Sequence, residues 1–375
     1  MAETDTGIDV KSSELTSMIQ TLQVPWDKSL DRFLEQSDRK KGLSKEVLEH
    51  IYRQKWFKMF VPKEHGGLAL SLLEGVRLQE SLAAIDGSLG WTVTLCSGAN
   101  WFVGFLKDPL VIHSFDRPET CWGGSGMATG WAQAHESGYI INGQWKYATG
   151  APHLTAFTVN CQLRDERNTL ILANGEPVIK SFYLLPSEVS VFPDWNAIGL
   201  AATTSHRFEV KHQWVPSNRA FELTPLHIAH PDPIYHLSFL TFAEVTLVGN
   251  YMGMATHFLE AIERSIIESE ALTPVDTLHS IRKIKARLMA NRTHFYETLA
   301  QLWQELSTEG MVLAQMEMEM QEACIAVVQC CYKAIQDVFP TVGMMVVCSD
   351  TDLNKIWLDF NTATQHKLIR SLLLS

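Results

Sequence analysis

The stretch CWGGSGMATGWAQAHESGYIINGQWKYATG, from Cys121 to Gly150, divides the chain into two flanks of different character. Its glycines alternate with β-branched and aromatic residues, which is typical of strands and turns. Within it, Gly138–Gln144 predicts a strand, and Asn142-Gly143 is a strong hairpin signal. Further strands are predicted at Phe157–Leu163, Ser181–Leu185 and His206–Lys211. We therefore expect a small antiparallel β domain over residues 118–230.

The two flanks of this stretch carry apolar residues at helical spacing. Before it, helices are predicted at Ser13–Gln23, Trp26–Leu34, from Ser44 onward, at Leu72–Ala84 and at Trp91–Leu106. After it, long helices are predicted at Leu237–Glu268, Val275–Leu306, Met311–Phe339 and Thr351–Leu374. These patterns predict an N-terminal α-helical domain over residues 1–117 and a C-terminal four-helix bundle over residues 231–375.

Length and composition limit the class of protein. The chain has 375 residues, of which 46% are hydrophobic and 19% charged, so it is long and apolar enough to bury a large core. A net charge of −11 argues against nucleic acid or an anionic membrane as a partner. The first residues do not resemble a signal peptide, and no apolar run approaches ~20 residues. We therefore expect a cytoplasmic protein.

The cysteines do not follow the spacing of a disulfide framework or a zinc site. No CxxC pair occurs, and the number of cysteines is odd. The seven are Cys96, Cys121, Cys161, Cys324, Cys330, Cys331 and Cys348. The sequence therefore predicts no metal ligands.

The order of these motifs resembles the acyl-CoA dehydrogenase superfamily along nearly the whole chain. FVPKEHGGLALSLLEGVRLQESLAAIDGSLGW, Phe60–Trp91, looks like its N-terminal signature, and Cys121–Gly150 looks like its flavin-contacting segment. Asn196–Pro216 resembles the stretch that closes its β domain. The resemblance implies an α+β fold in which a central antiparallel β domain lies between two helical domains. It also implies a homotetramer.

Three features resemble one branch of that superfamily, the two-component flavin monooxygenases that act on 4-hydroxyphenylacetate or dibenzothiophene. They are Gly90-Trp91 after Asp86-Gly87-Ser88, the glycine-rich turn Trp122–Ser125, and LNKIWLDFNTATQH at Leu353–His366. The resemblance implies an oxidoreductase that takes reduced flavin (FMNH2 or FADH2) from a separate reductase. Such an enzyme uses O2 through a C4a-hydroperoxide to hydroxylate a small organic molecule.

The same resemblance assigns roles to individual residues. His366 is the catalytic acid or base, because histidine titrates near neutral pH. Thr149 and Tyr147 would lie at the isoalloxazine ring, with Thr149 close to N5 and also counted as catalytic. Trp91 and Trp122 would flank the ring, and Ser125 would bind its polar edge. The residues expected to face the substrate are Asn100 and Trp101.

Two alternatives remain open from the sequence. An FAD-dependent acyl-CoA dehydrogenase needs a glutamate base, yet residues 340–352 contain no glutamate. At the other position where the family places that base, the alignment puts Ala243, with Glu244 one residue away. The second alternative is a non-catalytic homologue that binds flavin or another ligand. It is motivated by Leu358 where the branch has arginine, and by Asn100 and Thr149 where some members have histidine and serine.

Overall fold

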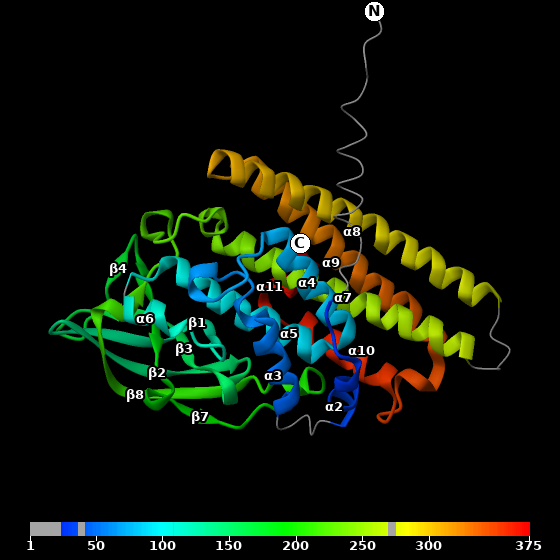
Figure 1. Cartoon of the computed structure of the whole chain (residues 1–375), viewed down its shortest axis with the longest axis horizontal. Helices are drawn as coiled ribbons and strands as arrows, with labels where there is room; N and C mark the ends of the chain where they lie inside the picture. Colours follow the sequence, from blue (N-terminus) through cyan, green and yellow to red (C-terminus); the bar gives the residue numbers. More distant parts are fainter. Residues whose placement is uncertain (1–23, 37–41, 108, 269–274) are drawn as a thin grey trace, which may run out of the picture.

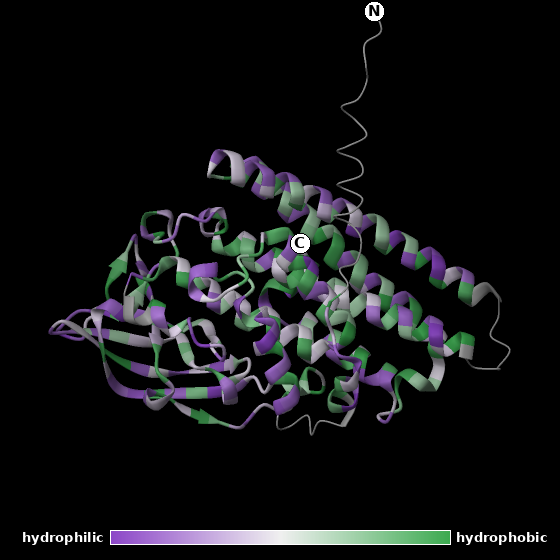
Figure 2. Ribbon diagram, viewed as in Figure 1, coloured by the Kyte–Doolittle hydropathy of each residue, from purple (hydrophilic) through white to green (hydrophobic). Residues whose placement is uncertain are grey.

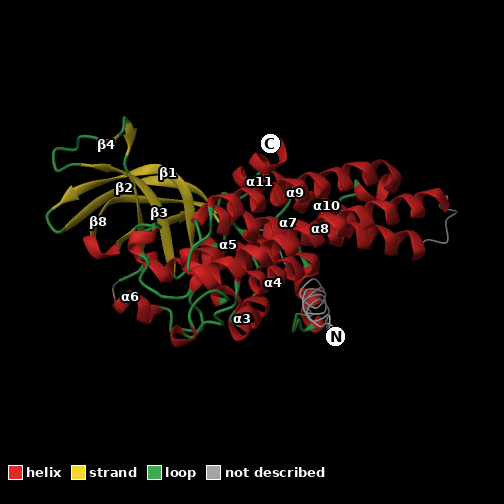
Figure 3. Cartoon of the chain, turned by 90° about the horizontal axis from the view of Figure 1, so that it is seen from above, coloured by secondary structure: helices red, strands yellow, loops and turns green. Residues whose placement is uncertain are grey.

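The computed structural model describes residues 24–36, 42–107, 109–268 and 275–375. The helix predicted at Ser13–Gln23 lies outside these ranges. The β-sheet forms one end of the molecule, and the long C-terminal helices extend from the other (Figures 1 and 3). Helices α4 (Leu72–Ile85) and α5 (Gly87–Asn100) of the N-terminal part lie between them.

The described N-terminal helices are α2 (Asp31–Gln36), α3 (Lys45–Gln54), α4 (Leu72–Ile85), α5 (Gly87–Asn100) and α6 (Pro109–Ser114). Capping side chains set the start of α3, α4 and α5. Ser44 caps α3 as predicted, and Ser71 and Glu74 form a capping box at α4. The prediction that α5 starts at Trp91 was wrong, because the Asp86 side chain accepts a hydrogen bond from the Leu89 N–H and starts this helix at Gly87.

A seven-stranded sheet has the order β7-β8-β2-β1-β3-β6-β9. Its strands are β1 (Trp122–His135), β2 (Gly138–Ala148), β3 (Ala156–Arg164), β6 (Ile179–Leu184), β7 (Ser190–Phe192), β8 (His206–Pro216) and β9 (Ala220–Phe221). A separate two-stranded sheet pairs β4 (Leu172–Ala173) with β5 (Glu176–Pro177). The neighbours in the large sheet are antiparallel except β1 and β3, which are parallel, so the predicted antiparallel sheet is only mostly antiparallel.

The hairpin predicted at Asn142-Gly143 is wrong. These residues lie inside β2, and the chain reverses between β1 and β2 at Glu136 and Ser137 instead. A register shift in the pairing of β2 with β8 falls at Asn142 and Gly143. Glycine is needed at position 143 because the strands pack closely here: an added Cβ at Gly143 would lie 2.5 Å from the Cα of Gly130. The glycine therefore marks a bulge rather than a turn.

The C-terminal part is helical as predicted. It contains α7 (Phe239–Glu268), α8 (Val275–Glu309), α9 (Ala314–Val342), α10 (Asp352–Thr364) and α11 (Lys367–Leu374). The single helix predicted at Thr351–Leu374 is in fact two helices, because the backbone of His366 is extended and the residue caps α11. Figure 2 shows more hydrophilic residues on α8 than on α7, which lies against α4 near the centre.

Close packing holds α4 against α7. An added Cβ at Gly253 of α7 would lie 2.1 Å from the main-chain oxygen of Glu80. The Glu80 side chain also joins α4 to α8 through a buried bidentate ion pair with Arg292 and a hydrogen bond from the Tyr296 hydroxyl. None of the described helices is both long and apolar enough to cross a membrane.

Candidate active site

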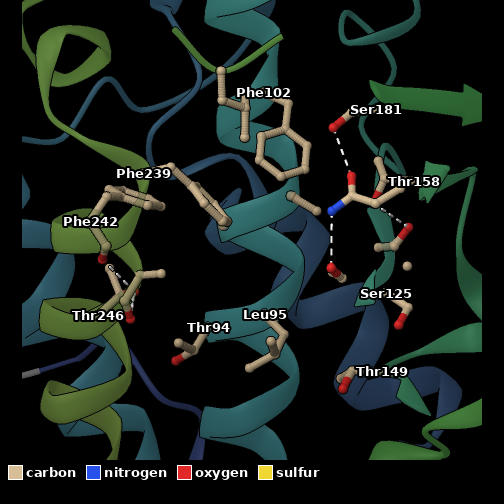
Figure 4. Close-up of a pocket in the computed structure, with 18 of the residues that line it drawn as sticks. Thr94, Leu95, Phe102, Ser125, Thr149, Thr158, Ser181, Phe239, Phe242 and Thr246 are labelled. Atoms are coloured by element: carbon tan, nitrogen blue, oxygen red, sulfur yellow. Dashed lines mark hydrogen bonds between the residues drawn. The ribbon is translucent and has the colours of Figure 1, made fainter. Parts of the chain in front are cut away.

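A cavity of about 230 Å³ lies between the sheet and the central helices. Residues of α5 and α7 form one side, and residues of β1, β3 and β6 form the other (Figure 4). The turn between α5 and β1, the end of β2 and the segment after β9 complete the lining. Elements from all three parts of the chain therefore meet here, as expected for a ligand site at an interface between layers.

The sheet side of the cavity is polar. The Ser181 hydroxyl donates to Asn160 Oδ1 at 2.7 Å, and Asn160 Nδ2 donates to the Gly126 carbonyl at 3.0 Å. The Thr158 hydroxyl donates to the Gly123 carbonyl at 3.3 Å. These bonds fix the wall through neighbouring strands, and Figure 4 shows the polar groups of Ser125, Thr158 and Ser181 on that side.

The helical side of the cavity is aromatic and apolar. Phe102 contacts both Phe239 and Phe221, with ring centroids 5.7 and 5.3 Å apart. Phe242 lies further along α7 and is buried. Phe239 is 40% exposed, so this wall includes a ring that solvent reaches. In Figure 4 the rings of Phe239 and Phe242 lie on the side opposite the polar groups, and the ring of Phe102 lies near the middle.

The cavity lining carries no ionic side chain. Among the lining residues, all of which belong to the described part of the chain, there is no Asp, Glu, Lys, Arg or His. Tyr147 is the one lining residue with a titratable side chain. A buried carboxylate ligand would therefore find no opposite charge, so the arrangement favours a neutral ligand.

Three of the sequence-predicted residues line this cavity: Thr149, Ser125 and Tyr147. The Thr149 hydroxyl is buried and lies 3.0 Å from the Ser205 hydroxyl, which lies 2.8 Å from that of Thr203. Ser125 is half-buried and accepts a weak hydrogen bond of 3.4 Å from the Met127 N–H. Tyr147 has a left-handed φ of 68° and a side chain that is 61% exposed. Such strained backbone is concentrated at functional sites.

Trp91 and His366 lie beside each other next to this region. Their ring centroids are 5.4 Å apart with the planes at 73°. Trp91 precedes the lining residues Thr94 and Leu95 by one helical turn of α5. Burial lowers the pKa of His366 to about 4, so the ring is neutral at pH 7. Its Nδ1 is buried without a hydrogen-bond partner, which leaves one ring nitrogen available to a ligand.

The structure does not bring Asn100, Trp101 and Trp122 into the cavity lining. Asn100 is fully buried; its amide donates to the carbonyls of Phe57 and Thr120, and its carbonyl accepts from the Trp122 N–H. Trp101 is also fully buried and stacks on Phe242, so it supports the aromatic wall from behind.

Trp122 packs on Phe115 and Tyr183 inside the molecule and is 2% exposed. The side chains of Asn100, Trp101 and Trp122 thus lie away from the cavity. Ser125 and Thr149, which belong to the same glycine-rich segment as Trp122, do line it.

Glu244 faces away from the cavity. Its neighbour Ala243 lines the cavity, whereas Glu244 is 6% exposed and forms a hydrogen bond with Gln321 of α9. Burial raises the pKa of its carboxyl. The alternative of a dehydrogenase base at this position is therefore not supported by the geometry.

Several lining residues were not predicted from the sequence: Asn160, Ser181, Thr158, Phe221, Phe239 and Phe242. The polar members sit on strands that were predicted, but a single strand pattern does not say which neighbouring strand shares its polar face. Pairing β3 with β6 places Asn160 opposite Ser181. That register depends on long-range pairing and is not visible in local sequence.

Two family models match this chain and together cover more than half of it. The acyl-CoA dehydrogenase N-terminal domain matches residues 12–103, and the acyl-CoA dehydrogenase C-terminal domain matches residues 249–371. The chain therefore belongs to the acyl-CoA dehydrogenase superfamily, as the resemblance of its motifs predicted.

Relatives of known name lie in the monooxygenase branch. A pigment production hydroxylase of Rhodococcus sp. is 32% identical over 212 residues, a match spanning 53% of each chain. An indole-3-acetate monooxygenase of Acinetobacter baumannii is 22% identical over 339 residues, or 88% of this chain and 85% of the relative. The flavin-dependent monooxygenase oxygenase subunit HsaA of Mycobacterium tuberculosis is 24% identical, over 53% of this chain and 51% of the relative. The predicted preference for this branch over the dehydrogenases is confirmed by these names.

Solved structures show the same fold. XiaF from Streptomyces sp., solved in complex with FADH2 and glycerol, superimposes with a TM-score of 0.79 at 17% identity. The superposition covers 98% of this chain and 96% of XiaF. The predicted acyl-CoA dehydrogenase-like fold is therefore confirmed over nearly the whole chain.

Proposed function

We propose that this chain is the oxygenase of a two-component flavin-dependent monooxygenase. It would take reduced flavin, FMNH2 or FADH2, from a separate reductase, and use O2 to hydroxylate a small neutral aromatic substrate. The observation that carries the proposal is the cavity, which has a polar sheet wall, an aromatic helical wall and no ionic side chain. The names of the relatives and the reduced flavin bound to XiaF support the same activity.

The polar wall and its surroundings fit a flavin. The residues proposed to contact it are Thr149, Ser125, Tyr147, Trp91 and His366. The Thr149 hydroxyl is held by Ser205, and Ser125 has a proton to donate. Tyr147 offers an exposed ring at the cavity edge that a planar ligand would cover. When bound, reduced flavin would supply the electrons that activate O2.

His366 is proposed to hold or move a proton. Its unpartnered Nδ1 can donate or accept one hydrogen bond, and its low pKa keeps the ring uncharged. A neutral imidazole in a dry site can exchange a proton with bound ligand groups without leaving a buried charge behind. The apolar contact with Trp91 limits the approach of water.

The substrate is proposed to be aromatic and uncharged. Phe102, Phe239 and Phe242 provide ring faces for stacking, and Asn160 with Ser181 provides polar groups for an oxygen or nitrogen substituent. A carboxylate would lose its hydration without gaining a cation, so we expect carboxylated analogues to bind about tenfold more weakly or worse. Binding of matched neutral and carboxylated aromatic compounds, measured by flavin fluorescence, tests this point.

The role of His366 is tested by replacing it with alanine. We expect the variant to oxidise reduced flavin but to release hydrogen peroxide in place of hydroxylated product. The matched control is His257→Ala, because His257 is a second buried histidine with a pKa lowered to about 4 and does not line the cavity. Equal ratios of product to peroxide in wild type and His366→Ala would remove His366 from the reaction.

The same assay separates the alternatives. A dehydrogenase would hold oxidised FAD and lose its colour on addition of an acyl-CoA. A non-catalytic homologue would form neither product nor protein-dependent peroxide with any compound that binds. Hydroxylated product that depends on reduced flavin and on O2 supports the proposed function over both.

A further inference from the structure

Behind Thr149 lies a cluster of three side chains that the proposed reaction does not use. They are Cys96 of α5, Cys121 immediately before β1, and His153 in the short turn after β2. Each offers one atom that can bind a metal ion, and these atoms all lie within 4.8 Å of one another. Both cysteines are fully buried. The cluster thus joins three segments whose neighbouring residues line the cavity.

The histidine of the cluster points toward the sulfur. His153 Nε2 is buried and has no hydrogen-bond partner outside the cluster. An added Cβ at Gly150 would lie 2.7 Å from this nitrogen and 3.4 Å from Cys96 Sγ, so both atoms face the same small space. The left-handed backbone of Gly150, with φ of 73°, provides that space. The ring nitrogen and the Cys96 sulfur are therefore close enough to bind the same ion.

The backbone of each residue is held in place. The Cys121 N–H donates to Thr155 Oγ1 at 3.0 Å, and its carbonyl accepts from the Thr155 N–H at 2.7 Å. The His153 N–H donates to the Gly150 carbonyl at 2.9 Å, and the His153 ring stacks on Phe57. Cys96 sits within the helix α5. The three possible ligands are therefore presented by ordered backbone rather than by a loop tip.

The donor atoms select the class of metal. Two thiolates and one neutral imidazole balance the charge of a divalent cation, so the complex is neutral and suits a fully buried position. Sulfur and imidazole ligands favour zinc over magnesium or calcium, which prefer oxygen. Bonds of ~2.3 Å to sulfur and ~2.0 Å to nitrogen place tetrahedral ligand atoms roughly 3.5–3.8 Å apart. Small side-chain movements would close the cluster to that spacing.

We propose that Cys96, Cys121 and His153 bind one zinc ion, which ties α5 to the start of β1 and to the turn after β2. The site has three protein ligands, which leaves the fourth tetrahedral position of the ion to a water molecule, and it stands apart from the proposed oxygenase activity. Cys96 Sγ lies 3.8 Å from the Thr149 carbonyl, so the ion would stiffen the cavity wall at that residue. The sequence predicted no metal because the ligands come from three separate elements and follow none of the usual spacings.

The test is metal analysis of the full chain without an affinity tag, purified under reducing conditions from zinc-supplemented cells. Wild type should hold about one zinc per chain. Cys96→Ser and Cys121→Ser should hold less than about a tenth of that, with His153→Gln also reduced. The matched control is Cys161→Ser, since Cys161 is a buried cysteine of β3 outside the cluster, and it should keep its zinc.

A second measurement uses the wild type alone, so it does not depend on how the variants fold. Metal-free protein titrated with cobalt should show thiolate-to-cobalt absorption that saturates at about one ion per chain and disappears when zinc is added. The proposal is overturned if metal-free wild type shows no saturable thiolate-to-cobalt absorption. It is also overturned if protein purified under reducing conditions carries a Cys96–Cys121 disulfide, seen as the loss of two hydrogens in the intact mass.

Discussion

His366 combines a buried position with an unpartnered ring nitrogen, and this combination has a consequence for stability. The pKa of its ring is lowered from 6.5 to about 4 by burial. The unfolded chain therefore binds a proton below about pH 6.5 that the folded chain excludes until about pH 4. The stabilising contribution of a neutral His366 is complete above pH 6.5 and is lost as the pH falls through that window.

Replacement of His366 by glutamine should remove this dependence. We expect wild type to lose about 1–2 kcal/mol more stability between pH 7 and pH 5 than His366→Gln does. Urea unfolding followed by tryptophan fluorescence at the two pH values measures the difference. An identical loss in both proteins would show that burial does not hold the ring neutral.

Gly98 offers a second test at the scale of one residue. It lines the cavity from α5, and an added Cβ there would have only Phe242 Cε1 within 4 Å, at 3.9 Å. Gly98→Ala should fold well and gain about 0.5–1 kcal/mol, because alanine is the better helix residue. Gly98→Leu should fill the cavity and raise the KM for an aromatic substrate about tenfold or more. Equal KM values for the two variants would place the substrate elsewhere.

Motifs in the sequence predicted some of the individual residues that line the cavity, but not all of them. Ser125, Tyr147 and Thr149 line the cavity, while Asn100 and Trp101 are held behind it by hydrogen bonds and stacking. Motif spacing locates a residue on its element but does not give its direction toward or away from a cavity. That direction is set by packing between elements far apart in the chain.

The buried group Glu80, Arg292 and Tyr296 carries the contact of α4 with α8. Glu80 Oε1 lies 2.6 Å from Arg292 Nε, Oε2 lies 2.9 Å from Nη2, and both carboxylate and guanidinium are about 5% exposed. Removing one charge leaves the other buried without its partner, which typically costs about 3–5 kcal/mol. We expect Glu80→Gln to lower stability by that order, as measured by thermal unfolding.

The control for this prediction is Glu49→Gln. Glu49 pairs with Lys45 on the surface of α3, with side chains 58% and 85% exposed. Exposed pairs of this kind contribute no more than about 0.5 kcal/mol. Comparable losses in the two variants would contradict the view that the buried pair holds α4 to α8.

The elements themselves were largely predictable because their signals are local. Capping at Ser44 and the apolar periodicity of α4, α7 and α8 gave helices within a few residues of their bounds. The failures have a physical cause in long-range packing. Asn142-Gly143 forms a bulge because β8 pairs with β2 on that side, and the parallel pairing of β1 with β3 has no local signature.

At the scale of the whole molecule, the C-terminal helices carry apolar side chains that face solvent in a single chain. Ile267, Met289, Met311 and Met318 are each more than half exposed, on or beside α7, α8 and α9. We propose that they form part of the interface of a homotetramer. Light scattering should give about four times the chain mass of 42.3 kDa, and a monomer would contradict this assembly.

We propose that the cavity between the sheet and the helices protects reduced flavin during its reaction with O2. The most direct test mixes the anaerobic complex of protein and reduced flavin with oxygenated buffer in a stopped-flow spectrometer. We expect a clear lag, relative to free reduced flavin, before the absorption of oxidised flavin appears, and hydroxylated product when a neutral aromatic compound is present. Oxidation as fast as that of free reduced flavin, with peroxide as the only product, would contradict it.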